Sequence, residues 1–87
     1  MKPRQIEAFR AVIETGSVTA AADRLRISQP AVSKLIMQLE DATRLALFVR
    51  DRQRLVPTPE ARLLFEEIDR VFLGVDRIER FSEDLRE

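Results

Sequence analysis

Side chains able to recognise nucleic acid gather between positions 28 and 34, where the chain reads Ser-Gln-Pro-Ala-Val-Ser-Lys. The Gln29 amide can form two hydrogen bonds to adenine, and the Ser33 hydroxyl can bond to a base edge or a phosphate. Pro30 offers an apolar contact to a thymine methyl group, and Lys34 can reach guanine or phosphate. If these residues share a helix that enters a groove of DNA, Gln29, Pro30, Ser33 and Lys34 are expected to contact the bases.

Other kinds of chemistry have little support in the composition. The chain contains no Cys and no His, so zinc sites built on those ligands and Ser/His or Cys/His nucleophile pairs are excluded. Asp and Glu could still act as acid and base, but none lies inside an apolar run that would tune it for catalysis. We therefore expect no enzymatic activity, no metal site and no cofactor in this chain.

The residues around the polar cluster predict a helix from the N-cap Ser28 to about Ala42. At about 100° per residue, the two faces of this helix differ in character. The face expected to meet the core carries Ala31, Val32, Leu35, Ile36, Leu39 and Ala42. The opposite face carries Gln29, Pro30, Ser33, Lys34, Met37 and Gln38. A solvated surface is the alternative for this second face, but the absence of acids between Ser28 and Leu39 favours contact with phosphates and base edges.

Two shorter helices are predicted upstream, over residues 3–15 and 17–25. The second contains three consecutive alanines, which would let a neighbouring helix pack closely against it. The link to the next helix is only a few residues long, and two helices joined by so tight a turn indicate a helix-turn-helix. We expect contacts to the DNA backbone from the helix-start residues Ser17, Thr19 and Ser28.

Residues 47–56 predict a β-hairpin, because short β-prone ends flank a polar centre at residues 51–53. Arg50, Arg52 and Arg54 alternate along this segment, so strand geometry would point them to one side. Cations in this position are expected to contact the DNA backbone, where they supply affinity and not base identity.

A structural role is the alternative for the same cations. Arg50 or Arg54 could form an ion pair with Asp51 or Glu40, which would hold the hairpin and leave the DNA uncontacted. In both cases the three helices and the hairpin form one unit. We expect residues 1–57 to be a winged helix-turn-helix domain in a mainly α chain.

Residues 58–87 predict one long helix, with Thr58 as the N-cap and a proline in the first turn. Its large apolar residues recur at alternating spacings of four and three, which is typical of a coiled-coil seam. The predicted dimerisation residues are Leu64, Ile68, Val71, Val75, Ile78 and Leu85, with Ser82 as one polar position. A stripe of this kind is costly to leave in water, so we expect a homodimer. The alternative is that this apolar stripe packs on the winged helix-turn-helix of the same chain (residues 1–57, here called the head), with help from Phe65 and Phe72.

The charges are divided unevenly along the chain. Residues 1–56 carry ten basic and six acidic side chains, whereas residues 57–87 carry five basic and nine acidic ones. This suggests a DNA-facing head on a solvated stalk, although an ordinary charged surface fits equally well. The composition is globular, and no apolar run approaches the ~20 residues that span a bilayer. We expect no membrane partner and a cytoplasmic location.

Several stretches of this sequence resemble LysR-type transcriptional regulators. The likeness begins at Ala-Ala-Ala (residues 20–22), Ser-Gln-Pro-Ala-Val-Ser (28–33) and Ile-Met-Gln-Leu-Glu (36–40). It continues in the same order at Leu-Phe-Val-Arg (47–50) and Pro-Thr-Pro-Glu-Ala (57–61). One helix-turn-helix pattern is a weak signal, but these motifs at this spacing are strong.

The resemblance implies sequence-specific binding of double-stranded DNA at an interrupted palindromic operator. It places DNA contacts on the same four positions, Gln29, Pro30, Ser33 and Lys34. It also implies antiparallel pairing of the linker helices, in a homodimer or in a tetramer of the full-length protein, whereas the seam by itself allows a parallel pair as well. The effector domain of such regulators is absent from this chain, so we expect the chain to be a segment of a longer protein.

The sequence departs from the family pattern in two places. Thr43-Arg44 stands where the family commonly has Leu-Gly, so a glycine cap is missing and the exit from the helix could be turned differently. Glu60-Ala61 stands where Ala-Gly is frequent. The segment from residue 42 to 48 and the run over residues 67–74 are similar to the octopine and nopaline catabolism regulators within the family.

Two other functions compete with this interpretation. An RNA-binding module is disfavoured because the chain has no Tyr or Trp to stack on bases. A helical adaptor that uses only its coiled-coil seam is the second alternative. Salt-dependent retention of duplex DNA, compared with single-stranded RNA, would separate the three.

Overall fold

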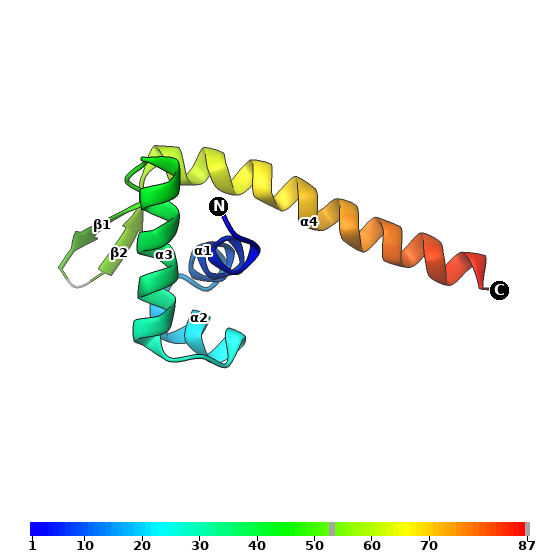
Figure 1. Cartoon of the computed structure of the whole chain (residues 1–87), viewed down its shortest axis with the longest axis horizontal. Coiled ribbons are helices and arrows are strands. Elements are labelled where there is room, and N and C mark those ends of the chain that lie inside the picture. The colour runs from blue at the N-terminus through cyan, green and yellow to red at the C-terminus, as the bar shows by residue number, and fades with distance from the viewer. Residues whose placement is uncertain (53, 87) are drawn as a thin grey trace.

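The computed structural model describes residues 1–52 and 54–86. It contains four helices and one antiparallel hairpin in the predicted order (Figure 1). The elements are α1 (Pro3–Thr15), α2 (Val18–Leu25), α3 (Gln29–Thr43), β1 (Phe48–Asp51), β2 (Arg54–Pro57) and α4 (Pro59–Leu85). The predicted winged helix-turn-helix followed by a long helix is confirmed. Gln53 of the predicted hairpin tip and the last residue, Glu87, lie outside the described residues.

Side-chain caps begin three of the four helices, as the sequence predicts. Ser17, Ser28 and Thr58 each accept a hydrogen bond from the backbone N–H three residues further on, at 2.9, 3.2 and 3.1 Å. The N–H groups of a first helical turn have no partner inside the helix, so these caps satisfy donors that would otherwise be free. The three helix starts are therefore determined locally.

Two helices end on arginines in the left-handed conformation. Arg26 has φ 57° and Arg44 has φ 58°, and the Arg44 N–H donates to the carbonyl of Glu40 at 2.8 Å. The missing glycine therefore does not change the exit from α3, because Arg44 adopts the backbone conformation that glycine favours. A residue with a Cβ is strained in this region.

We expect Arg44→Gly to raise the free energy of unfolding by about 0.5–1 kcal/mol, because glycine relieves the strain at the end of α3. Chemical denaturation measures the difference. The control is Ala42→Gly, two residues earlier in the helix, which should lower stability by about 1 kcal/mol. Equal effects of the two glycines would contradict a strained cap at Arg44.

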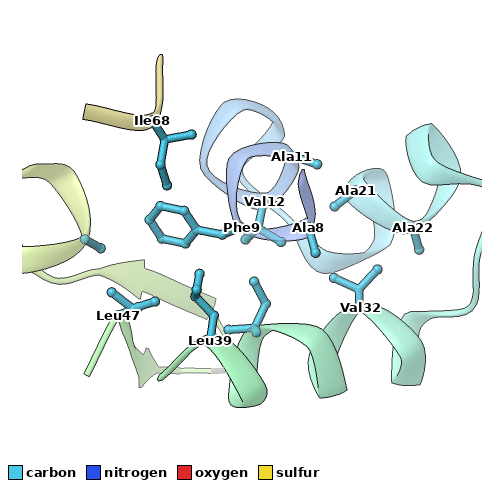
Figure 2. Packing of buried hydrophobic residues seen from close by; sticks show 12 residues of the cluster. Ala8, Phe9, Ala11, Val12, Ala21, Ala22, Val32, Leu39, Leu47 and Ile68 are labelled. Carbon is cyan, nitrogen blue, oxygen red and sulfur yellow. The ribbon is translucent and has the colours of Figure 1, made fainter. Parts of the chain in front are cut away.

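The core lies where α1, α2, α3 and the start of the hairpin meet (Figure 2). Phe9, Leu39, Leu47 and Val32 are its largest fully buried side chains. Phe9 meets Phe48 of the hairpin edge-to-face, with ring centroids 5.8 Å apart, a favoured geometry for aromatic pairs. Ala21 and Ala22 of α2 are buried in this core, which confirms that small residues there allow close helix packing.

The core-facing arc predicted for α3 is correct except at its end. Val32, Ile36 and Leu39 are buried, but Ala42 is exposed. A helical wheel shows which residues share a face, but it does not show where the packing partner of that face stops. Ala42 lies beyond that point.

The first half of α4 packs on the head, and the second half extends away from it (Figure 1). Ala61 and Ile68 are buried, and Leu64, Phe65 and Phe72 pack against the core. The expectation that Leu64 and Ile68 would lie exposed on a single copy is therefore wrong, because the head covers this part of the stripe. For this half of the helix the fold-back alternative is correct.

A cation–π contact and an ion pair connect α4 to α1 of the head. The guanidinium carbon of Arg10 lies 4.3 Å from the centre of the Phe72 ring, and the Nη2 atom of Arg10 lies 3.5 Å from Asp69. A cation over an aromatic face is attracted by the electrons of the ring. The predicted contact between Phe72 and the head is confirmed. Within the described residues, no helix is long and apolar enough to cross a membrane.

Candidate nucleic-acid interface

A hollow with a volume of about 840 Å³ lies between the start of α2, the start of α3 and the hairpin. We call it the wing hollow, and the hairpin formed by β1 and β2 the wing. The hollow is lined by Gly16, Ser17, Val18, Thr19, Gln29, Pro30, Ser33, Arg50, Asp51, Arg54, Leu55, Val56 and Pro57. Three separate parts of the chain thus meet at one surface.

The wing hollow brings together seven of the ten residues predicted to contact DNA. Ser28, Lys34 and Arg52 are outside its lining, although all three are exposed. Sequence reasoning did not identify Gly16 and Val18 as parts of the surface. Gly16 ends α1 with φ 80°, and this turn brings the start of α2 to the edge of the hollow.

The outward face of α3 is organised as the helical wheel predicts. Gln29, Pro30 and Lys34 are exposed, and Ser33 is half-buried beside the wing hollow. Met37 continues this face one turn further along and is also exposed. The four predicted base-contact residues therefore lie on the surface of one helix, at its N-terminal end.

Helix starts provide further hydrogen-bond donors at this surface. The Ser17 and Ser28 oxygens accept their capping hydrogen bonds, and each hydroxyl proton remains able to donate. The first turn of α2 lines the wing hollow. Backbone N–H groups at a helix start favour phosphate, because the helix dipole is positive there.

The wing does not present its arginines on one side, so that prediction is wrong. Arg50 pairs with Leu55 across the hairpin, and Asp51 pairs with Arg54. Cross-strand partners share a face and successive residues alternate, so Arg50 and Arg54 point to opposite faces. The turn between the strands breaks the alternation that the sequence suggested. Arg52 lies in that turn with φ 50°.

The predicted alternative for the wing arginines, a structural ion pair, is not observed in residues 1–52 and 54–86. The salt bridges found there involve Arg4, Arg10, Arg24 and Arg70. Glu40, one of the proposed partners, has a different role. Its carboxylate accepts hydrogen bonds from the backbone N–H groups of Leu47 and Phe48, at 2.8 and 3.4 Å.

The wing is therefore tied to the helices at both of its ends. Glu40 of α3 holds the chain where it enters β1. Thr58 holds the exit: its hydroxyl donates to the carbonyl of Ala46 at 2.6 Å, and its N–H donates to the carbonyl of Leu47 at 3.0 Å. Sequence reasoning identified Thr58 only as a cap. These links position the wing relative to α3.

We expect Glu40→Ala to lower the free energy of unfolding by about 1.5–3 kcal/mol, because it removes a charged acceptor from two backbone donors at the base of the wing. Glu40→Gln keeps an acceptor oxygen and should lose about half as much. Thermal or chemical unfolding measures both. If both variants match the unsubstituted chain, Glu40 does not hold the wing.

The geometry agrees with solved DNA-binding segments. The structure superposes on the crystal structure of the BenM DNA-binding domain in complex with catB site 1 DNA with a TM-score of 0.86 and 30% identity, covering 100% of this chain and 98% of that one. For the complex of the CbnR DNA-binding domain with DNA the TM-score is 0.82 and the identity 29%, with 100% of both chains covered.

Curated relatives show the same likeness in sequence. The octopine catabolism/uptake operon regulatory protein OccR of Rhizobium meliloti is 48% identical over 85 residues, which is 98% of this chain and 29% of that protein. The regulatory protein NocR of Agrobacterium fabrum is 46% identical over 86 residues, 99% of this chain and 29% of that protein. The predicted similarity to the octopine and nopaline regulators is confirmed. The chain spans about three tenths of the length of these relatives.

A family model supports the assignment over most of the chain. The model for bacterial regulatory helix-turn-helix proteins of the lysR family matches residues 3–62. These residues run from the start of α1 through the wing into the first turn of α4. The chain belongs to the lysR family of bacterial regulatory helix-turn-helix proteins.

Proposed function

We propose that this chain binds double-stranded DNA sequence-specifically as a homodimer, and that it is the DNA-binding segment of a bacterial transcriptional regulator and not an enzyme. The solved complexes of the BenM and CbnR domains contain DNA, which supports the same ligand here. Such a regulator works in the cytoplasm, at an interrupted palindromic operator. This segment needs no cofactor, and its effector domain would lie elsewhere in the longer protein, which is a dimer or a tetramer.

The observation that carries the proposal is the convergence of three elements on the wing hollow. The start of α3 presents Gln29, Pro30 and Ser33, which suit base edges, and the start of α2 presents donors that suit phosphate. Arg50 and Arg54 lie on opposite faces of the wing, but both line the hollow and add positive charge to it. Base-reading and phosphate-holding groups on one concave surface are what a duplex requires.

The second half of α4 supplies the surface for a homodimer. Its exposed apolar residues on the predicted seam are Val71, Val75, Ile78 and Leu85. Gly74, Arg77, Ile78 and Phe81 line a hollow of about 410 Å³. Phe81, which the seam prediction omitted, lies at its edge.

We expect Gln29→Ala to weaken specific DNA binding by about 1–3 kcal/mol and to leave non-specific binding nearly unchanged, because the amide contacts a base and not the backbone. A duplex is first recovered from a random library with the unsubstituted chain. Titrations then compare this duplex with a scrambled one at a fixed salt concentration. An equal loss on both duplexes would remove Gln29 from base recognition.

A further inference from the structure

We propose that Met37 is a further specificity-determining residue, whose thioether side chain contacts the C5-methyl group of a thymine in the major groove. The inference rests on the proposed function, in which the N-terminal end of α3 enters that groove. It adds a contact one helical turn beyond the residues that line the wing hollow.

The exposure of Met37 is unusual for its position. Of the other large apolar residues in the middle of α3, Val32, Ile36 and Leu39 are at most 5% exposed and Leu35 is half-buried, whereas Met37 is 63% exposed. Met37 follows Ser33 by four residues and Lys34 by three, so it lies on the same face of the helix. It sits about 6 Å further along the helix axis than Ser33. A large apolar side chain thus projects from the surface that faces the ligand.

Met37 is the side chain that this turn of α3 offers to a ligand, because its neighbours are buried or already hydrogen-bonded. Gln38 is half-buried, and its amide lies 3.4 Å from the Gln5 amide in a hydrogen bond. Glu40 is occupied by the backbone of the wing. Asp41 is the next exposed residue, and its carboxylate is disfavoured next to phosphates. All of α3 is described, and between Lys34 and Asp41 Met37 is its one exposed residue.

The chemistry of the groove indicates the group that Met37 meets. The thymine methyl is an apolar group on the major-groove edge, where the other distinguishing groups are hydrogen-bond donors and acceptors. Methionine is unbranched and polarizable, so it can adapt its shape to a methyl group. It offers no strong hydrogen bond. A contact of this kind distinguishes thymine from uracil and 5-methylcytosine from cytosine.

Replacement of single thymines by deoxyuridine tests the inference. In a duplex selected from a random library with this chain, each thymine is replaced in turn, which removes one methyl group and changes no hydrogen bond. At one or two positions in each half-site we expect binding by the unsubstituted chain to weaken about three- to fivefold. Met37→Ala should bind both duplexes equally at those positions, and Met37→Leu should keep most of the difference.

A matched control is Leu73→Ala, which shortens an exposed apolar side chain of α4 and should keep the full sensitivity to deoxyuridine. The inference is overturned if no thymine methyl affects binding, or if Met37→Ala keeps the same pattern of sensitivity. In those cases a loss of specificity in Gln29→Ala would still support the proposed function. Failure to recover any preferred duplex would overturn both.

Discussion

Val75→Asp is expected to give a folded monomer that binds its operator at least a hundredfold more weakly. Val75 is 46% exposed and follows Phe72, the last residue of α4 that packs against the core. In a paired helix it would be covered, and two carboxylates near a two-fold axis would lose hydration without gaining a partner. One head alone also reads only one half-site, so specific affinity falls with the dimer.

Sedimentation or light scattering at micromolar concentration measures the association, and circular dichroism shows whether the variant is folded. The control is Leu73→Asp on the same helix. Leu73 is 53% exposed but lies outside the predicted seam, so this variant should remain a dimer. A Val75→Asp variant that stays dimeric would rule out this face of α4 as the interface.

Ile68→Ala is expected to lower the free energy of unfolding by about 2–4 kcal/mol, although Ile68 belongs to the same heptad pattern as Val75. Ile68 is 7% exposed and points from α4 toward the ring of Phe9 (Figure 2). Removing its side-chain atoms leaves a cavity between α4 and the head. In a domain of this size the loss is a large part of the total stability.

The stability difference should be measured in the Val75→Asp background, because dimerisation would otherwise add to the stability of every variant. Ile78→Ala in that background is the control. Ile78 is exposed, so its truncation should change stability by less than about 0.5 kcal/mol. If Ile78→Ala costs as much as Ile68→Ala, the packing of α4 on the head does not depend on Ile68.

The contrast between Ile68 and Val75 shows where prediction from the sequence ends. Heptad spacing places both on one stripe of a helix, but it does not tell which partner covers each of them. The helix starts at Ser17, Ser28 and Thr58 were predictable, because a cap depends on residues within one turn. The left-handed end of α3 at Arg44 was not, because its residue type does not favour that conformation.

Some features of the candidate site could also be predicted from local sequence, and others could not. The face of α3 that carries Gln29 and Ser33 follows from helical periodicity within a short segment. The wing was predicted as a hairpin, but the sides to which its arginines point depend on the turn between the strands. The links from Glu40 and Thr58 to the wing join residues 7 to 12 positions apart that belong to different elements. No local pattern in the sequence predicts such contacts.

The affinity of this chain for a selected duplex, divided by its affinity for a scrambled duplex at the same salt concentration, tests the central claim most directly. Sequence-specific binding of double-stranded DNA predicts a ratio of at least about a thousand. It also predicts that single-stranded RNA of equal length binds more weakly than the selected duplex. Equal affinity for both duplexes, or tighter binding of the RNA, would contradict the account.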